Sequence, residues 1–277
     1  MEVNKGDIVA SISVSKSWEE TGAFIKREQR LIGPVVLALA FLPTLVFRVF
    51  APRVNMTDMM AGNYPAYLPW LSYGLMFIQL IGGASLVLMA LGPRDPVGTL
   101  IVTGFKRAVV VVLATLLGAL IATPILVVVL VVASIVGGIP TSPAAMPPGF
   151  VMIVGLLTIA LLLLALRVIL YMPAAVAEPI GPWVALKRGW VLGRGNGSRL
   201  IATMLLLLIG AAVLSFAVTA VVGSVTQLVL GSNQGPTLGG ILVGLVAAAI
   251  GAAVFVVQYV MLANLYRQAV NNNPDAA

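Results

Sequence analysis

The chain of 277 residues contains no cysteine and no histidine, and it has only nine acidic residues. Without cysteine it has no disulfide, iron–sulfur or thiolate site. Without histidine it has no imidazole for general-base catalysis, for metal binding or for axial haem ligation. The few carboxylates form no pair inside an apolar run, whereas a metal-dependent phosphodiesterase needs several that converge. We therefore expect no catalytic residue, no cofactor and no metal, and we favour a protein that is not an enzyme.

Charge is also scarce, since charged residues make up 9% of the chain and hydrophobic residues 60%. A soluble domain usually carries about 25% charged residues. The apolar residues gather in six long runs, each able to cover the roughly 20 residues that a helix needs to cross the hydrocarbon core. The runs are Leu31–Phe50, Tyr67–Leu91, Ala108–Val136, Phe150–Met172, Leu200–Leu230 and Leu238–Leu265. The pattern predicts a polytopic membrane protein.

Helices are the expected form of these runs, because a membrane span must satisfy its own backbone hydrogen bonds. A β-barrel would instead show short segments of alternating polarity. We expect an all-α membrane domain over residues 31–266, a polar amphipathic segment over residues 1–30 and a tail over residues 267–277. The first thirty residues are too rich in charge for the apolar region of a signal peptide, so Leu31 should begin an uncleaved first span.

The basic residues lie on one side of the expected membrane domain. If six spans cross, the opposite side receives only Arg48 and Arg53. The positive-inside rule then places both termini in the cytoplasm, and the net charge of +7 indicates attraction to anionic lipid rather than nucleic-acid binding. The basic side would carry Lys5, Lys16, Lys26, Arg27, Arg30, Arg94, Lys106, Arg107, Lys187, Arg188, Arg194, Arg199 and Arg267.

An internal repeat is indicated by two basic pairs followed by a proline inside a span. Pro43 lies sixteen residues after Arg27, and Pro124 lies seventeen residues after Arg107. We expect three hairpins of spans, each preceded by a basic amphipathic interface helix over residues 11–30, 96–107 and 179–194. The alternative is that basic residues flank the inward end of any span.

The third interface segment carries the strongest local pattern. Ile180, Trp183, Val184, Trp190 and Val191 gather on one side of a helix, and glycines from Gly193 onward should end it. Tryptophan favours the headgroup region, and basic residues favour anionic lipid. The segment is therefore either an ordinary interfacial anchor or a specific site for a headgroup or a protein partner.

The residues around this segment resemble the membrane domain associated with glycerophosphoryl diester phosphodiesterases and related bacterial six-span proteins. The matching positions are Arg167, Pro173, Glu178, Gly181, Ala185, Leu186, Lys187, Arg188, Trp190, Leu192, Arg194 and Gly195. Gly189 and Gly193 replace the hydroxyl residues of that pattern, and Gly197 and Ser198 replace its aromatic residues. The resemblance implies a bacterial inner-membrane protein. It does not imply the hydrolase, because the separate catalytic domain found in some relatives is not part of this sequence.

Charged and small residues inside the spans give further hypotheses. Arg167 lies inside the fourth run on its cytoplasmic half, where it could snorkel, pair with Glu178 or contact a lipid phosphate or a substrate. Three span glutamines are expected to form interhelical hydrogen bonds, with a translocation path as the alternative. They are Gln79, Gln227 and Gln258. A ladder of small residues on the last span is expected to pack within the chain rather than between two copies. It consists of Gly240, Gly244, Ala248 and Ala252.

The function that these patterns favour is a non-catalytic membrane module that organises or senses lipids, anionic ones among them, or docks a protein partner at the cytoplasmic leaflet. The alternatives are a transporter or lipid-translocating permease and, with less support, a membrane-embedded glycerophosphodiester hydrolase. The expected contact residues are Arg167, Glu178, Trp183, Lys187, Arg188, Trp190 and Arg194.

Overall fold

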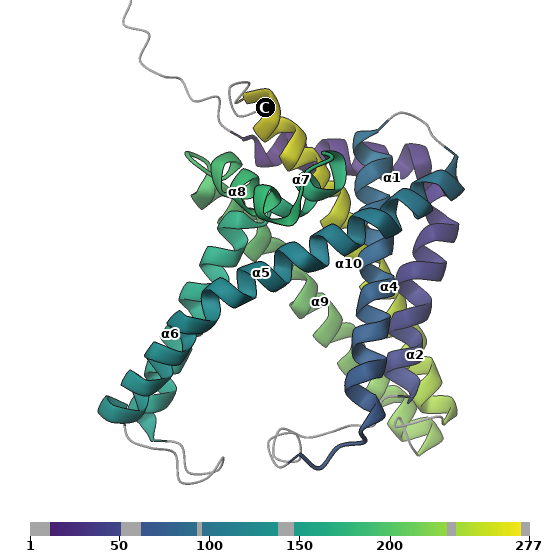
Figure 1. Ribbon diagram of the computed structural model, residues 1–277. Helices are drawn as coiled ribbons and strands as arrows, with labels where there is room; N and C mark the ends of the chain where they lie inside the picture. The colour runs from purple at the N-terminus through teal and green to yellow at the C-terminus, as the bar shows by residue number, and fades with distance from the viewer. Residues whose placement is uncertain (1–11, 51–61, 93–95, 138–146, 232–236, 273–277) are drawn as a thin grey trace, which may run out of the picture.

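The computed structural model describes residues 12–50, 62–92, 96–137, 147–231 and 237–272 (Figure 1). Expectations for residues 1–11 and 273–277 lie outside these ranges, as do those for Arg53 and Arg94. The described residues form helices and contain no strand. The helices are α1 (Val14–Val36), the π-helix η1 (Leu37–Phe41), α2 (Leu42–Phe50), α4 (Tyr67–Leu91), α5 (Val97–Gly137), α6 (Pro148–Val168), α7 (Tyr171–Ala177), α8 (Pro182–Leu192), α9 (Gly197–Leu230) and α10 (Leu238–Asn272).

Six helical stretches of the described chain are long and apolar enough to cross a membrane. Each contains one of the six predicted runs, and the second has the predicted bounds, Tyr67–Leu91, whereas the others extend beyond the prediction. The prediction of an all-helical integral membrane protein is therefore confirmed.

The first span contains a π-helical turn directly before Pro43. Proline has no N–H to donate to the carbonyl four residues earlier, and its ring crowds that carbonyl. Before this proline the chain forms the wider turn of η1 at Leu37–Phe41, and it continues as an α-helix in α2. The proline inside this span thus lies beside a change of helix type.

α5 is a single helix of 41 residues, which is about 62 Å long. Residues 97–107, which were expected to form part of a separate interface helix, are its first turns, because residues 105–117 contain no glycine or proline that would break the helix. A straight helix of this length exceeds the hydrocarbon thickness of roughly 30 Å. α5 accordingly runs obliquely across the molecule and carries α6 away from α4 (Figure 1).

Helices pack closely among η1, α2, α4 and α10, where small residues face neighbouring helices. A Cβ atom on Gly244 of α10 would lie 3.1 Å from Val49 Cγ2, and one on Gly82 of α4 would lie 2.8 Å from Leu39 Cβ. The rest of the small-residue ladder on α10, Gly240, Ala248 and Ala252, is buried as well. Here the backbones approach closely, as small residues allow in membranes.

Two of the span glutamines donate hydrogen bonds. Gln79 Nε2 on α4 donates to Thr44 Oγ1 on α2 over 3.0 Å, which is an interhelical bond. Gln227 Nε2 instead donates to the carbonyl of Gly231 at the end of its own helix, over 3.4 Å.

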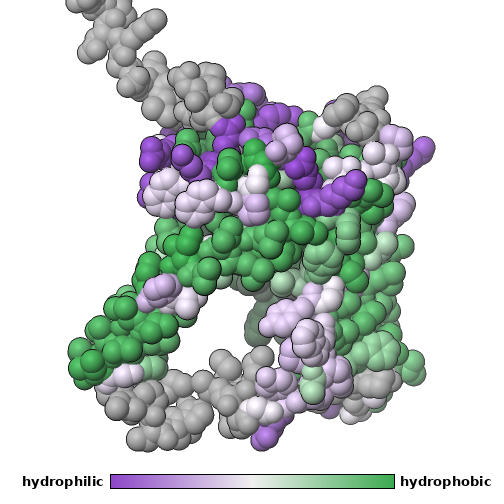
Figure 2. Space-filling view, in the orientation of Figure 1, coloured by the Kyte–Doolittle hydropathy of each residue, from purple (hydrophilic) through white to green (hydrophobic). Residues whose placement is uncertain are grey.

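Hydrophilic residues gather at one end of the molecule, above a wide apolar band (Figure 2). We call this the basic end. It is formed by the first half of α1, by α7 and α8, and by the last turns of α10 (Figure 1). Below it, the space-filling view is hollowed between the arm of α5 and α6 and the rest of the molecule (Figure 2).

Candidate functional site

The candidate site is the fold-back of α6, α7 and α8 at the basic end. α6 ends at Val168, α7 follows at once from Tyr171, and Glu178 caps α7 in an extended conformation. Gly181 and Pro182 then begin α8, with proline in the first helical turn, where its missing N–H is tolerated. Prolines and a glycine before α8, and glycines after it, explain why it is a separate helix.

Two glycines of α8 and its C-terminal end allow this fold-back to close. A Cβ atom on Gly189 would lie 2.5 Å from Tyr171 N and 2.6 Å from Val168 O, and one on Gly193 would lie 2.6 Å from Arg167 O. All three contacts are with backbone atoms, which cannot rotate away. The two positions where the sequence departs from the hydroxyl residues of the resembling family are therefore direct backbone contacts in this chain.

Glu178 is the hub of the polar contacts. Its Oε1 accepts a hydrogen bond from Arg188 Nε over 3.1 Å and another from the hydroxyl of Tyr266 on α10. The side chains are only 15% (Arg188) and 25% (Glu178) exposed, so both charges are largely withdrawn from solvent. The cluster ties α7 and α8 to α10. It also pairs Glu178 with Arg188, whereas one hypothesis from the sequence paired it with Arg167.

Arg167 lies against an aromatic ring instead. Its guanidinium carbon is 4.5 Å from the ring centroid of Trp190, a cation–π contact. Its buried Nε has no hydrogen-bond partner in the structure. Gly197, the first residue of α9, also lies next to Arg167, because a Cβ atom on this glycine would be 3.6 Å from Arg167 Cγ. Arg167 thus fills the space between α8 and the start of α9.

An apolar groove of about 620 Å³ opens beside this cluster, between α5, α6, α7 and α8. We call it the α8 groove. Its lining residues include Lys187, Trp183 and Trp190, and also Thr115 and Tyr171, whose hydroxyl oxygens are 2.9 Å apart. Trp183 is 60% exposed and Lys187 is exposed.

The seven residues predicted as contacts thus separate into three groups. Arg167 with Trp190, and Glu178 with Arg188, form the packed cluster. Trp183, Lys187 and Trp190 line the α8 groove. Arg194 is exposed in the turn between α8 and α9, apart from both.

Sequence reasoning did not select four residues of this region. Tyr266 completes the hub, but it is 88 residues from Glu178, so no local spacing relates the two. Thr115, Gly118 and Tyr171 belong to the α8 groove, and only the packing of α5 against α7 brings the hydroxyls of Thr115 and Tyr171 together. The paired proline and glycine breaks around α8 were the available signal that α7 and α8 fold back.

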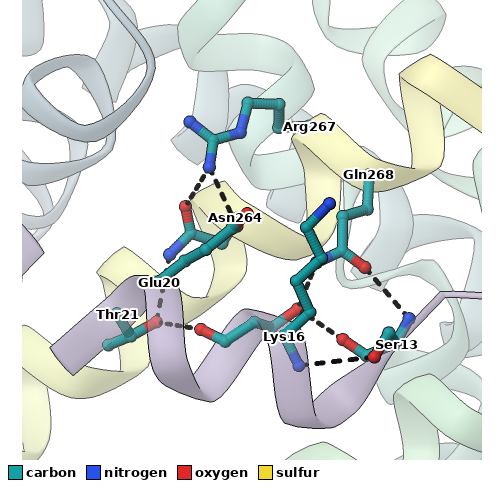
Figure 3. A network of polar contacts seen from close by, with 8 residues as sticks. Ser13, Lys16, Glu20, Thr21, Asn264, Arg267 and Gln268 are labelled. Carbon is teal, nitrogen blue, oxygen red and sulfur yellow. Dashed lines mark hydrogen bonds and ion pairs between the residues drawn. The ribbon is translucent and has the colours of Figure 1, made fainter. Parts of the chain in front are cut away.

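A second polar network joins α1 to α10 at the basic end (Figure 3). Asn264 Nδ2 donates to Thr21 Oγ1 over 3.1 Å, and Arg267 forms an ion pair of 2.9 Å with Glu20. Gln268 accepts from the backbone N–H of Ser13 through Oε1, over 3.0 Å. Thr21 and Asn264 are each 3% exposed, and their bond to each other lets both be buried. The network fixes the first half of α1 across α10.

Within the described ranges, no three acidic side chains lie close enough together to hold a metal ion. Comparisons with protein-family models, with curated proteins and with solved structures find no match for the chain.

Proposed function

We propose that this protein is a non-catalytic lipid-binding module of the membrane, and that the α8 groove holds an acyl chain of an anionic phospholipid whose phosphate contacts Lys187. The observation that carries the proposal is the combination of an apolar groove with one ammonium and two indoles among its lining residues. Apolar surface suits the chain, tryptophan suits the headgroup level, and lysine suits the phosphate.

The orientation belongs to the same proposal. The basic end faces the cytoplasm, both termini lie there, and the membrane is the inner membrane of a bacterium. The distribution of lysine and arginine supports this orientation, and the resemblance supports the membrane. α8 acts as an interface helix in the third of three hairpin repeats, with the two earlier interface segments continuous with their spans.

Arg188 and Glu178 have a supporting role in this proposal. Their mutual bond occupies the Arg188 Nε, and Tyr266 of α10 donates to the same carboxylate oxygen of Glu178. We infer that these contacts position Lys187 and Trp183 and that Arg188 and Glu178 do not bind the headgroup. Arg194, exposed in the next turn, adds to the positive potential that attracts anionic lipid.

The test is lipid analysis of the full chain after gentle solubilisation, with two variants that change the groove in different ways. Lys187→Gln removes the ammonium, and Gly118→Leu fills the groove, where a Cβ meets only Leu186 Cδ2 at 3.8 Å. We expect both to lower retained phosphatidylglycerol, the first by roughly two- to fivefold, as for an exposed ion pair.

Matched controls keep the result specific. Lys26→Gln makes the same change of charge on exposed α1, and Gly74→Leu adds the same side chain to α4 where nothing lies within 4 Å. Neither residue lines the α8 groove. Equal retention of anionic lipid by all four variants and the unaltered chain would contradict the proposal.

A lipid-translocating permease is the second candidate, and one observation favours it. The far part of the arm of α5 and α6 diverges from the other described helices and leaves the hollow seen in Figure 2. Reconstitution in vesicles that carry a fluorescent phospholipid in both leaflets separates the candidates. Dithionite bleaching of about half the label indicates a binding module, and bleaching of nearly all of it indicates a scramblase.

A further inference from the structure

A second apolar groove, separate from the α8 groove, lies between α1, α9 and α10. Its volume is about 730 Å³, and we call it the α1 groove. Ser15, Trp18 and Glu19 of α1 form its polar end, and Gly210 of α9 and Val257 of α10 are among its apolar walls. The two grooves share no lining residue.

Thr203, at the polar end of this groove, has an unusual hydroxyl. Hydroxyls of other helices, such as Thr44, Thr115 and Thr158, donate to the carbonyl four residues earlier. Thr203 is 3% exposed, and its Oγ1 has no hydrogen-bond partner in the structure. A buried hydroxyl without a partner costs free energy. A polar group that enters the groove beside Thr203 can supply the missing partner after a rotation about χ1.

The charge at the mouth of the α1 groove is opposite to that of the α8 groove. Glu19 is the only charged residue among the described residues that line it. It accepts a weak hydrogen bond from the hydroxyl of Ser15 over 3.4 Å, and it takes part in none of the ion pairs among the described residues. An exposed carboxylate beside a hydroxyl and the indole of Trp18 suits a cationic group that donates hydrogen bonds.

The length of the groove along α9 is close to the hydrocarbon thickness of one leaflet. It extends along α9 from Thr203 to Leu214, which is about 16 Å of helix. That is roughly half of the hydrocarbon core. Gly210 lies on this path and a Cβ there would meet nothing within 4 Å, so the wall is open where an acyl chain would pass. The polar network of α1 with α10 (Figure 3) fixes the turn of α1 that follows Trp18 and Glu19, because Glu20 pairs with Arg267 and Thr21 accepts from Asn264.

We propose that the α1 groove binds a phospholipid whose headgroup carries a primary amine, with one acyl chain along α9 and α10 and the ammonium at Glu19. The lipid has the chemistry of phosphatidylethanolamine. This site is distinct from the anionic-lipid site proposed at Lys187, and either can fail without the other.

The experiment measures binding of defined lipids to the detergent-solubilised full chain by native mass spectrometry. Phosphatidylethanolamine is compared with phosphatidylcholine, whose quaternary ammonium has no N–H to donate, and with phosphatidylglycerol. We expect the unaltered chain to retain the amine lipid over phosphatidylcholine. Glu19→Gln should reduce this preference by roughly two- to fivefold, as for an exposed ion pair.

Two further variants test the groove itself. Gly210→Leu fills it without meeting protein atoms within 4 Å of the Cβ, and should bring amine-lipid retention to the background seen with phosphatidylcholine. Gly155→Leu on α6, equally open and outside both grooves, is the matched control and should bind as the unaltered chain does. Thr203→Val should weaken binding but raise the melting temperature without lipid, because it removes the unpaired hydroxyl.

Three results would overturn the proposal. One is full retention of phosphatidylethanolamine by Gly210→Leu. Another is that the unaltered chain binds phosphatidylethanolamine and phosphatidylcholine equally, and that Glu19→Gln changes the binding of neither lipid. The third is a Gly210→Leu chain that changes its oligomeric state with lipid retention intact, which would make the groove a contact between copies. Reduced retention of phosphatidylglycerol by Lys187→Gln would concern the α8 groove alone and would change none of these three results.

Discussion

The two halves of the membrane domain differ in how far their spans are buried against one another. In the spans that contain α1 with α2, α4 and α10, 28%, 33% and 33% of the most apolar window is buried inside the molecule. In the spans of α5, of α6 with α7, and of α9, the values are 6%, 6% and 0%. The apolar windows are at least as hydropathic in the second set, with mean hydropathies of 2.7 to 2.9 against 2.0, 2.0 and 2.7.

Hydropathy therefore places all six spans in the membrane but does not pair them. Pairing follows small residues: Gly82 and Gly83 on α4 and Gly244 on α10 let backbones and large side chains approach. Lipid is as apolar as leucine, so two leucine-rich helices gain little by touching. α5, α6 and α9 have the more open surfaces, and both proposed lipid grooves are lined by at least one of them.

The largest loss of stability is expected where leucine replaces a glycine that contacts a neighbouring helix. Gly82→Leu places a side chain where Leu39 Cβ and the ring of Phe255 lie, so α4 must separate from η1 and α10. We expect a loss of more than about 3 kcal/mol, as for severe overpacking, seen as aggregation on size-exclusion chromatography or a much lower melting temperature by tryptophan fluorescence.

Gly155→Leu in the open half and Gly74→Leu on α4 itself are the controls for this variant. Both glycines have nothing within 4 Å of a Cβ, so each should melt within a few degrees of the unaltered chain. A melting temperature of Gly82→Leu equal to those of the controls would show that the contact at Leu39 does not set the packing.

The next effect in size is expected at the tightest contact of the open half. Gly189→Ala adds a methyl against the backbone of Tyr171 and Val168, which forces α8 away from the α6–α7 junction. We expect a loss of about 2–3 kcal/mol and faster hydrogen exchange confined to α7 and α8. Gly118→Ala, with 3.8 Å of room to Leu186, should be neutral or slightly stabilising in the same measurement, because alanine favours helix over glycine.

The sequence predicts the spans because the signal is local. Twenty apolar residues and a lysine–arginine pair suffice, as for Ala108–Val136 after Lys106 and Arg107. The end of α8 is equally local, since Gly193, Gly195 and Gly197 follow it. The boundary between an interface helix and its span is a less reliable local signal. The break before α8 depends on Pro179 and Pro182, and α5 has no such break after Arg107.

The site could be predicted only in part, because its chemistry depends on pairing across the fold. Arg167 and Glu178 are eleven residues apart and opposite in charge, which made a pair a fair inference. The fold-back instead turns Arg188 toward Glu178 and brings Tyr266 from α10, while Arg167 stacks on Trp190. The orphan hydroxyl of Thr203 has no sequence signal, since its neighbours differ little from those of the bonded threonines.

A smaller effect should follow from loosening the hub that joins the two halves. Glu178→Gln removes the carboxylate that accepts from Arg188 and Tyr266, leaving a largely covered guanidinium beside a neutral amide. We expect a loss of about 2 kcal/mol for this variant and about 1 kcal/mol for Tyr266→Phe. Unfolding in detergent by circular dichroism gives the values. The double variant should lose less than the sum, since the two residues share one bond, and strict additivity would contradict the hub.

The smallest expected effect is at the ion pair of Arg267 with Glu20 in the well-packed half. The two side chains are 45% and 28% exposed, so solvent screens the pair and Arg267→Ala should cost less than about 1 kcal/mol. Its consequence should be local: faster hydrogen exchange in the first half of α1, with a difference that shrinks at high salt. Arg27→Ala, which breaks a pair with the adjacent Glu28 on the same helix, is the control and should leave that exchange unchanged. If Arg267→Ala also leaves that exchange unchanged, the attachment of α1 to α10 depends on Asn264 and Gln268 and not on this charge pair.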